Sequence, residues 1–189
     1  MSQHHHPLRY RPDYLRNGSP TGTLRESFPR WAITTDLTAP TTQVMTTVAV
    51  PLQAGDLVTN ITFKSGATAA DTPLNWWFAL YSSASTPALL AQTADQETAA
   101  WAANTAKTVA LATAQLITEP GVYFAAFMMK ATTVTTLLGR TVALAGASTG
   151  SISGQKPLAQ TSGSSLTTTA PATVATPTTS ALIPYVVLS

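Results

Sequence analysis

Cysteine is absent from the 189-residue sequence, and the three histidines all stand within its first six positions. The lack of cysteine excludes disulfide bonds, thiolate metal sites and a cysteine nucleophile, and it is compatible with any redox compartment. Because His4, His5 and His6 precede any folded domain, a Ser-His-Asp triad inside such a domain is excluded. Adjacent histidines on an extended chain point to alternating sides, so we interpret them as a polar surface segment and not as a metal site.

Charged side chains are also scarce, at 10% of the residues, against roughly 25% in an average soluble domain. Threonine is the commonest residue, and its β-branched side chain favours strands over helices. We therefore expect an all-β domain whose solvent-facing positions are filled mainly by Thr, Ser, Ala, Asn and Gln.

Long apolar runs are missing as well. No segment reaches the roughly 20 apolar residues of a membrane span, and the apolar stretch Val122 to Met129 ends at Lys130. The first residues contain no apolar core of a signal peptide. The sequence thus predicts a soluble protein, made and first folded in a cytoplasm, with no membrane partner.

The net charge of +2 is unevenly distributed. Residues 1–30 contain five arginines against Asp13 and Glu26, whereas residues 31–189 contain five basic and six acidic groups. Four prolines and two glycines interrupt the first segment, so it cannot form a helix or bury a core of its own. We predict an extended basic arm over residues 1–30 and a folded domain over residues 31–189.

Two strand-like segments with apolar side chains on both faces mark the centre of this domain. Within Asn75 to Tyr81, Trp76 falls on one face and Trp77 on the other, and Val122 to Met129 is built in the same way. Such a strand needs a second layer on one side and a loop, a neighbour or another subunit on the other.

Shorter strand candidates surround this pair, separated by frequent turn signals. In residues 57–65, strict alternation places Leu57, Ile61 and Phe63 on one face and Val58 on the other. A short helix fits only residues 95–106. The other strand candidates are residues 31–36, 44–52, 89–93, 108–111, 134–138, 141–147 and 181–188. This pattern predicts an antiparallel β-sandwich, with a jelly roll as the favoured topology and an immunoglobulin-like sandwich as the alternative.

Residues 148–180 are dominated by Ser, Thr, Gly, Ala and Pro and resemble a flexible linker in composition. An apolar strand candidate follows at residues 181–188, and a strand that apolar must pair into the sheet. We therefore interpret residues 148–180 as a long surface excursion within one domain, carrying a short edge strand.

Acidic side chains offer little chemistry. Asp95 and Glu97 are the closest pair in the predicted domain, and they suit either a calcium loop or a solvated turn. A glycosidase pair would have to come from carboxylates beside Gly, Pro or Thr, where such groups act as caps and turn formers, namely Asp56, Asp71, Asp95 and Glu119. No phosphate-binding, dinucleotide-binding or zinc spacing is present. We expect a protein that is not an enzyme and holds no cofactor or metal.

Four runs in the predicted sandwich carry a resemblance to a known family. They are Asn75-Trp76-Trp77-Phe78-Ala79-Leu80-Tyr81, Leu89-Leu90-Ala91-Gln92-Thr93-Ala94-Asp95, Ala100-Trp101-Ala102-Ala103-Asn104-Thr105-Ala106-Lys107 and Pro120-Gly121-Val122-Tyr123-Phe124. These runs look like β-sandwich modules in virion proteins of tailed bacteriophages, particularly those of actinobacterial hosts, which are usually labelled minor tail or minor capsid proteins. The resemblance covers residues 45–145 and the final strand. It implies a structural subunit of a virion assembled in the host cytoplasm, either a surface-exposed minor capsid or decoration protein or a minor tail protein.

The arm then becomes the candidate anchor to other virion proteins. Arginines suit bidentate contacts to carboxylates, and aromatic side chains supply rigid apolar area, the residue types that dominate interface hot spots. The candidate contact residues are Arg9, Tyr10, Arg11, Tyr14, Arg16, Arg25, Phe28, Arg30 and Trp31. The alternative is that the arm packs back on its own domain. Interleaved basic and aromatic residues also occur in nucleic-acid-binding segments, but five arginines in front of a slightly acidic domain are a weak footprint, so we expect no nucleic-acid partner.

Two further expectations concern surfaces of the domain. The apolar run Phe124 to Met129, Met45 and the low charge favour a homo-oligomer, with a trimer as the leading copy number. The alternative function is a carbohydrate-binding module for a host-surface glycan. Its sugar-stacking candidates are Trp76, Trp77, Trp101 and Tyr81.

Overall fold

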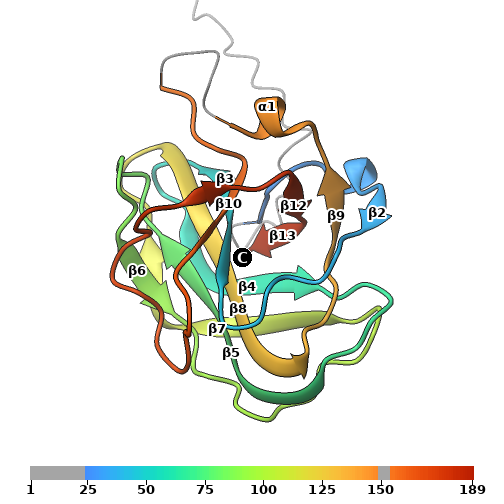
Figure 1. Ribbon diagram of the computed structural model, residues 1–189. Helices are drawn as coiled ribbons and strands as arrows, with labels where there is room; N and C mark the ends of the chain where they lie inside the picture. Colours follow the sequence, from blue (N-terminus) through green and yellow to red (C-terminus); the bar gives the residue numbers. More distant parts are fainter. Residues whose placement is uncertain (1–23, 149–153) are drawn as a thin grey trace, which may run out of the picture.

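The computed structural model describes residues 24–148 and 154–189. Within them the chain is built from antiparallel β-strands in packed sheets, so the predicted all-β sandwich is confirmed (Figure 1). No helix in these residues has the length and apolarity needed to span a membrane.

The larger sheet has the strand order β11-β10-β3-β8-β5-β6. Its strands are β3 (Met45–Leu52), β5 (Asp71–Tyr81), β6 (Leu89–Gln92), β8 (Gly121–Thr133), β10 (Ala159–Ser162) and β11 (Thr178–Thr179). The two segments predicted to form the centre are the long neighbours β5 and β8, which pair from Asp71 and Thr133 to Tyr81 and Phe124.

Two smaller sheets complete the fold. One has the order β1-β13-β4-β7 and the other the order β12-β9-β2. Their strands are β1 (Arg25–Glu26), β2 (Thr35–Asp36), β4 (Leu57–Lys64), β7 (Ala106–Leu116), β9 (Leu138–Thr141), β12 (Leu182–Pro184) and β13 (Val186–Leu188). The last predicted strand does pair into the sheets, but it divides at Tyr185, so that β12 lies against β9 and β13 against β4.

The main core lies between the larger sheet and β4, β7 and β13. Aromatic rings fill its centre: Phe63 and Phe78 have ring centroids 4.9 Å apart, and Trp76 and Trp101 have theirs 5.1 Å apart. Edge-to-face and tilted ring pairs of this kind add stabilisation beyond the apolar area that they bury. Phe127 joins the cluster from β8.

A second core covers the opposite face of β5 and β8. The excursion folds over this face: the Trp77 indole N–H donates to the Thr167 carbonyl at 2.7 Å, and the Tyr81 hydroxyl donates to the Pro171 carbonyl at 2.8 Å. Ala170 and Val174 are buried against the same cluster. A strand with two apolar faces was expected to need a loop, a neighbour or another subunit over its second face. In the structure this cover is a loop, the excursion. Phe124, Ala126 and Met128 are buried beneath it. The alternate residues of the run, Ala125, Phe127 and Met129, are buried in the main core, so the run does not form an exposed subunit interface.

The alternation expected in β4 is interrupted. Leu57 is 47% exposed whereas Val58 is fully buried, the reverse of the prediction. The pairing of β4 with β7 shifts between Val58 and Asn60, which moves every side chain before the shift to the other face. The Ser189 carbonyl occupies the irregularity and accepts the N–H groups of Thr59 and Asn60, each at 2.7 Å.

Several local predictions were wrong. Residues 95–106 form turns instead of a helix, because the Asp95 carboxylate accepts the N–H groups of Trp76 and Glu97 and fixes a turn beside β5. A short helix, α1 (Leu144–Ala147), lies within the strand expected at 141–147. Residues 31–36 contain the 3-10 helix η2 (Arg30–Ala32) and the two-residue β2. Residues 134–138 mostly form the link from β8 to β9.

Candidate anchoring surface

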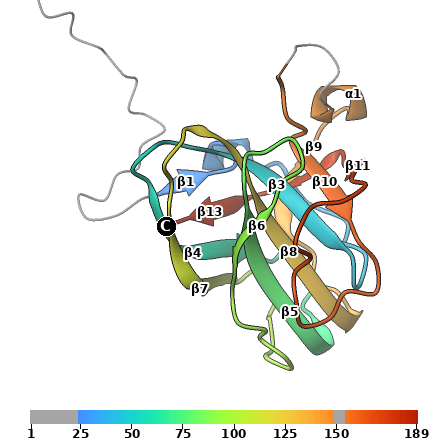
Figure 2. The ribbon, with the colours of Figure 1, turned by 90° about the vertical axis from the view of Figure 1, so that its left-hand side faces the viewer.

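Residues 24–31, which we call the strap, include β1, which forms one edge of the four-stranded sheet β1-β13-β4-β7. Arg25 pairs with Leu188 and Glu26 with Val187 across β1 and β13, and the Ser27 N–H donates to the Val186 carbonyl at 3.0 Å. Figure 2 shows β1, β13, β4 and β7 side by side. The last part of the predicted arm is therefore an edge strand of the sandwich, as the alternative of packing back on the domain would have it for these residues.

A buried ion pair holds the start of the strap. The Arg25 guanidinium is bidentate on Asp56, with Nε donating to Oδ2 at 2.8 Å and Nη2 donating to Oδ1. The two side chains are only 13% and 8% exposed. Asp56 Oδ2 also accepts the Gln53 N–H at 2.8 Å. Asp56 ends the turn between β3 of the larger sheet and β4 of the four-stranded sheet. The pair therefore joins the strap to the turn that connects these two sheets.

An aromatic contact holds the middle of the strap. The rings of Phe28 and Tyr185 meet edge to face with centroids 5.6 Å apart. The Tyr185 hydroxyl donates to a Glu26 carboxylate oxygen. Burial, together with the hydrogen bond to Glu26 and its negative charge, raises the pKa of Tyr185, and nearby Arg30 acts in the opposite direction.

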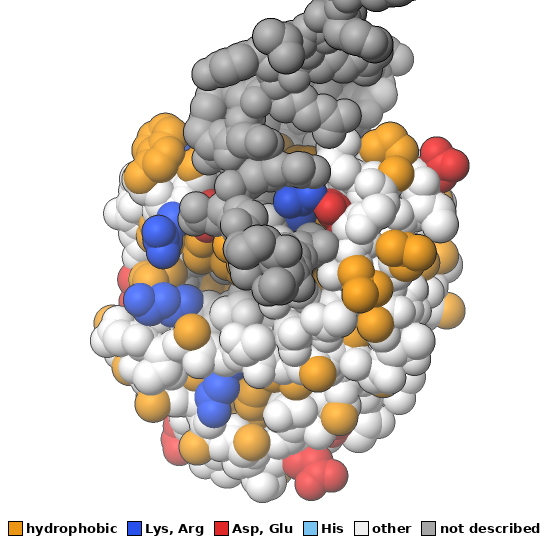
Figure 3. Space-filling view, turned by 180° about the vertical axis from the view of Figure 1, so that it is seen from behind, with side chains coloured by type: hydrophobic (Ala, Val, Ile, Leu, Met, Phe, Trp, Pro, Cys, Tyr) orange, Lys and Arg blue, Asp and Glu red, His pale blue; other side chains and the backbone are white. Residues whose placement is uncertain are grey.

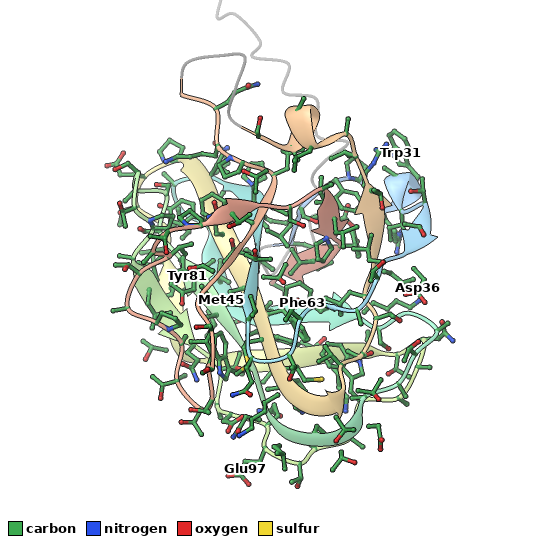
Figure 4. The ribbon with its side chains drawn as sticks, in the orientation of Figure 1. Trp31, Asp36, Met45, Phe63, Tyr81 and Glu97 are labelled. Carbon is green, nitrogen blue, oxygen red and sulfur yellow. The ribbon has the colours of Figure 1, made fainter. Side chains whose placement is uncertain are left out.

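The end of the strap is open to solvent. Trp31 is 86% exposed on η2, and the neighbouring Arg30 is exposed too (Figure 4). A tryptophan this exposed contributes little to its own core, and Trp and Arg are the side chains most enriched in binding hot spots.

The predicted contact residues thus divide into three groups. Arg25 and Phe28 are engaged within the chain, and Arg30 and Trp31 face solvent. The third group lies outside the described residues and consists of Arg9, Tyr10, Arg11, Tyr14 and Arg16, as do His4, His5 and His6. Partner contact by the arm remains a prediction.

Sequence reasoning missed one exposed feature near the strap. Leu116 at the end of β7 is 62% exposed and lies directly opposite Leu57 of β4. The predicted strand at 108–111 ended before Leu116. The exposure of Leu57 could not be predicted, because the irregularity in β4 leaves no mark in the periodic pattern.

The four aromatic side chains considered for sugar stacking are core residues. Trp76, Trp77, Trp101 and Tyr81 are each at most 1% exposed. Their polar atoms donate to backbone carbonyl groups, as with Trp76 Nε1 to Ala99 and Trp101 Nε1 to Thr105. None of the four presents a ring face to solvent.

The Asp95 carboxylate accepts three hydrogen bonds within its turn. It accepts the Asn75 side-chain amide at 2.6 Å, the Trp76 N–H at 2.9 Å and the Glu97 N–H at 3.2 Å. These contacts make Asp95 a turn former. Within residues 24–148 and 154–189, no three His, Cys, Asp or Glu side chains cluster in a way that could hold a metal ion.

The chain matches no protein-family model, and no curated protein shows significant similarity to it.

Proposed function

We propose that the chain is a non-enzymatic structural protein of a tailed-bacteriophage virion, a surface-exposed minor capsid or decoration subunit or a minor tail subunit. The resemblance of the four runs between Asn75 and Phe124 motivates this proposal, and a sandwich with two apolar cores and a sparsely charged surface agrees with it. Figure 3 shows how thinly charged side chains are scattered over one face. Dense packing of subunits is easier when like charges are few.

A jelly-roll topology is part of this proposal. The strand pairs are nested: β5 with β6, β4 with β7, β3 with β8 and β2 with β9. The order β3-β8-β5-β6 makes one four-stranded layer. A bridge between Ser65 and Leu137 links the β4–β7 pair to the β2–β9 pair and supports a second layer. A chain that folds as one long hairpin wrapped on itself has this pairing pattern.

The observation that carries the proposed role is the buried pair of Arg25 and Asp56. An arm that holds a domain on a particle must be firmly joined to the domain at its base. Breaking a buried ion pair by removing one partner typically costs about 3 to 5 kcal/mol. Residues 1–23 therefore lead directly into a base that is fixed by this pair and by the hydrogen bonds of β1.

The arm suggests the chemistry of its partner. Residues 1–23 contain Arg9, Arg11 and Arg16 against Asp13. Their binding surface is another virion protein with carboxylates placed for bidentate arginine contacts. Self-association, with a trimer favoured, stays in the proposal. It now rests on the low charge of the surface, because the apolar run that first suggested it is buried.

Deletion of residues 2–23 tests the proposed role. The structure places β1 after this segment, so the truncated protein should remain folded and soluble, with an unchanged β-type circular dichroism spectrum. It should be lost from purified phage particles, whereas the full chain is present, as measured by quantitative mass spectrometry and by immunogold labelling. Recovery of the truncated protein at the normal copy number would contradict anchoring by the arm, and absence of the full chain from particles would contradict a virion role.

A further inference from the structure

Lys130 of β8 and Asn75 of β5 are partners across the two central strands of the larger sheet (Figure 1). They are directly opposite each other on antiparallel strands, so their side chains lie on the same face, with Cβ atoms about 5 Å apart. The flexible four-carbon stem of a lysine is long enough to bring its amine to the side-chain carbonyl carbon of such a neighbour.

This pair lies at the margin of the second core. The next residues on the same face of the two strands are Trp77 and Met128, which pair with each other and are fully buried. Asn75 and Lys130 are themselves half-buried. The Lys130 amine makes no hydrogen bond and no ion pair with any residue of the described ranges 24–148 and 154–189. It is therefore not committed to another partner within these ranges.

Asp95 holds the side-chain amide of Asn75 from the other side. Its Oδ2 accepts the Asn75 Nδ2–H at 2.6 Å, and its Oδ1 accepts the backbone N–H groups of Trp76 and Glu97. The two backbone bonds fix the carboxylate and leave Oδ2 to the amide nitrogen. Hydrogen bonds to β5 hold the Asp95 turn on the β6 side of that strand, whereas Lys130 is on its β8 side. An amide group is thus flanked by a lysine and a carboxylate.

We propose that Lys130 and Asn75 become joined by an isopeptide bond, which the chain forms by itself with Asp95 as the acid–base group. The deprotonated Lys130 amine attacks Cγ of Asn75, and a new C–N bond forms. Asp95 Oδ2 takes a proton from the attacking nitrogen and passes it to Nδ2, whose bond to Cγ then breaks to release ammonia. The proton that the lysine ammonium loses before the attack leaves with the ammonia as ammonium, so atoms and charge balance without an oxidant or reductant.

The bond gives the fold a covalent tie that its composition otherwise lacks. The sequence has no cysteine for a disulfide, so a tie between strands must use other side chains. Joining β5 to β8 links the two strands whose side chains enter both cores. The reaction occurs once within the chain and needs no partner, and it does not depend on the proposed virion role.

Intact-mass spectrometry of the full-length protein, incubated at neutral pH, tests the bond. The mass should be lower than that of the sequence by one ammonia molecule, and tandem spectrometry of a tryptic digest should find a branched peptide that joins Lys130 to Asn75. Lys130→Arg and Asp95→Asn should each keep the sequence mass. Lys107→Arg is the matched control and should lose ammonia as the parent does, because Lys107 is also half-buried near this site, with Nζ 5.9 Å from the Trp76 ring centroid. Thermal unfolding checks that each variant is folded.

Three results would overturn the proposal in whole or in part. A parent protein that keeps its sequence mass after prolonged incubation contradicts the bond. Ammonia loss that persists in Lys130→Arg also contradicts it, since an asparagine loses ammonia when it closes on its own backbone as a succinimide. A branched peptide that still forms in Asp95→Asn leaves the bond in place and removes Asp95 as its acid–base group.

Discussion

The Asp36 carboxylate lies against Gly66, at the place where any side chain at position 66 would begin. A Cβ atom added to Gly66 would lie 1.7 Å from Asp36 Oδ1, while Asp36 Oδ2 accepts the Ala67 N–H at 2.7 Å. The carboxylate therefore sits where any other residue at position 66 would place its side chain. This arrangement ties β2 to the loop between β4 and β5.

Gly66→Ala should destabilise the fold by displacing the Asp36 carboxylate from the Ala67 N–H. A lost hydrogen bond to a charged group costs about 1.5 to 3 kcal/mol, and the low end applies because Asp36 is exposed. Asp36→Ala should have a similar cost. Urea unfolding of both single variants and the double variant measures the coupling, and the double variant should be little worse than Asp36→Ala. Fully additive losses would show that the alanine clashes with something else.

Gly139→Ala should cost more than Gly66→Ala. A Cβ at position 139 would lie 2.3 Å from the Ile183 carbonyl oxygen, and this obstacle is backbone, so β12 would have to separate from β9. We expect a loss of about 3 kcal/mol or more in the free energy of unfolding. Gly146→Ala is the control, because nothing lies within 4 Å of its added Cβ. It should be neutral or slightly stabilising in the same urea titration.

Arg25→Met should loosen the strap. It leaves Asp56 buried with the Gln53 N–H but without its cation, and such a change costs about 3 to 5 kcal/mol. The double variant Arg25→Met/Asp56→Asn should recover part of this loss, since no uncompensated charge remains. Denaturant unfolding measures both. An Arg25→Met variant as stable as the parent protein would refute the ion pair as the fixed base of the arm.

Alkaline pH should weaken the contact between the strap and Tyr185. Burial raises the pKa of Tyr185 in the folded state, so its protonated form is favoured there. The stabilisation is complete below the ordinary tyrosine pKa of about 10 and is lost as pH rises above it. Urea midpoints measured on either side of pH 10 should fall less in Tyr185→Phe than in the parent. A remaining decline is expected from Tyr81, whose pKa is also raised by burial.

The sequence predicted the architecture well where periodicity carries the information. Trp76 and Trp77 on opposite faces of one strand required two covers, and the structure has two cores. The excursion was expected to carry an edge strand, and β10 and β11 lie there. Composition alone gave no sign that Thr167 and Pro171 would seal the second core, because their contacts use backbone carbonyl groups, which every residue has.

The candidate site was less predictable. The residue type of Arg25 predicted that its guanidinium would bind a carboxylate. It did not indicate that this carboxylate is Asp56 of the same chain. Leu57 faces solvent because of a register shift, and the Ser189 carbonyl that accepts hydrogen bonds at this shift comes from a distant part of the sequence. Contacts of such long sequence separation leave no local pattern.

β13 lies between β1 and β4 in the four-stranded sheet. The backbone pairing of the strap therefore depends on residues 186–188, which pair in turn with β4. Arg25 reaches across β13 to Asp56 in the turn before β4, so β13 and the strap cannot separate from β4 together until this ion pair breaks. The strap thus helps to hold the last strand of the sandwich in its sheet, and a local opening at this edge must begin with the loss of the Arg25–Asp56 ion pair.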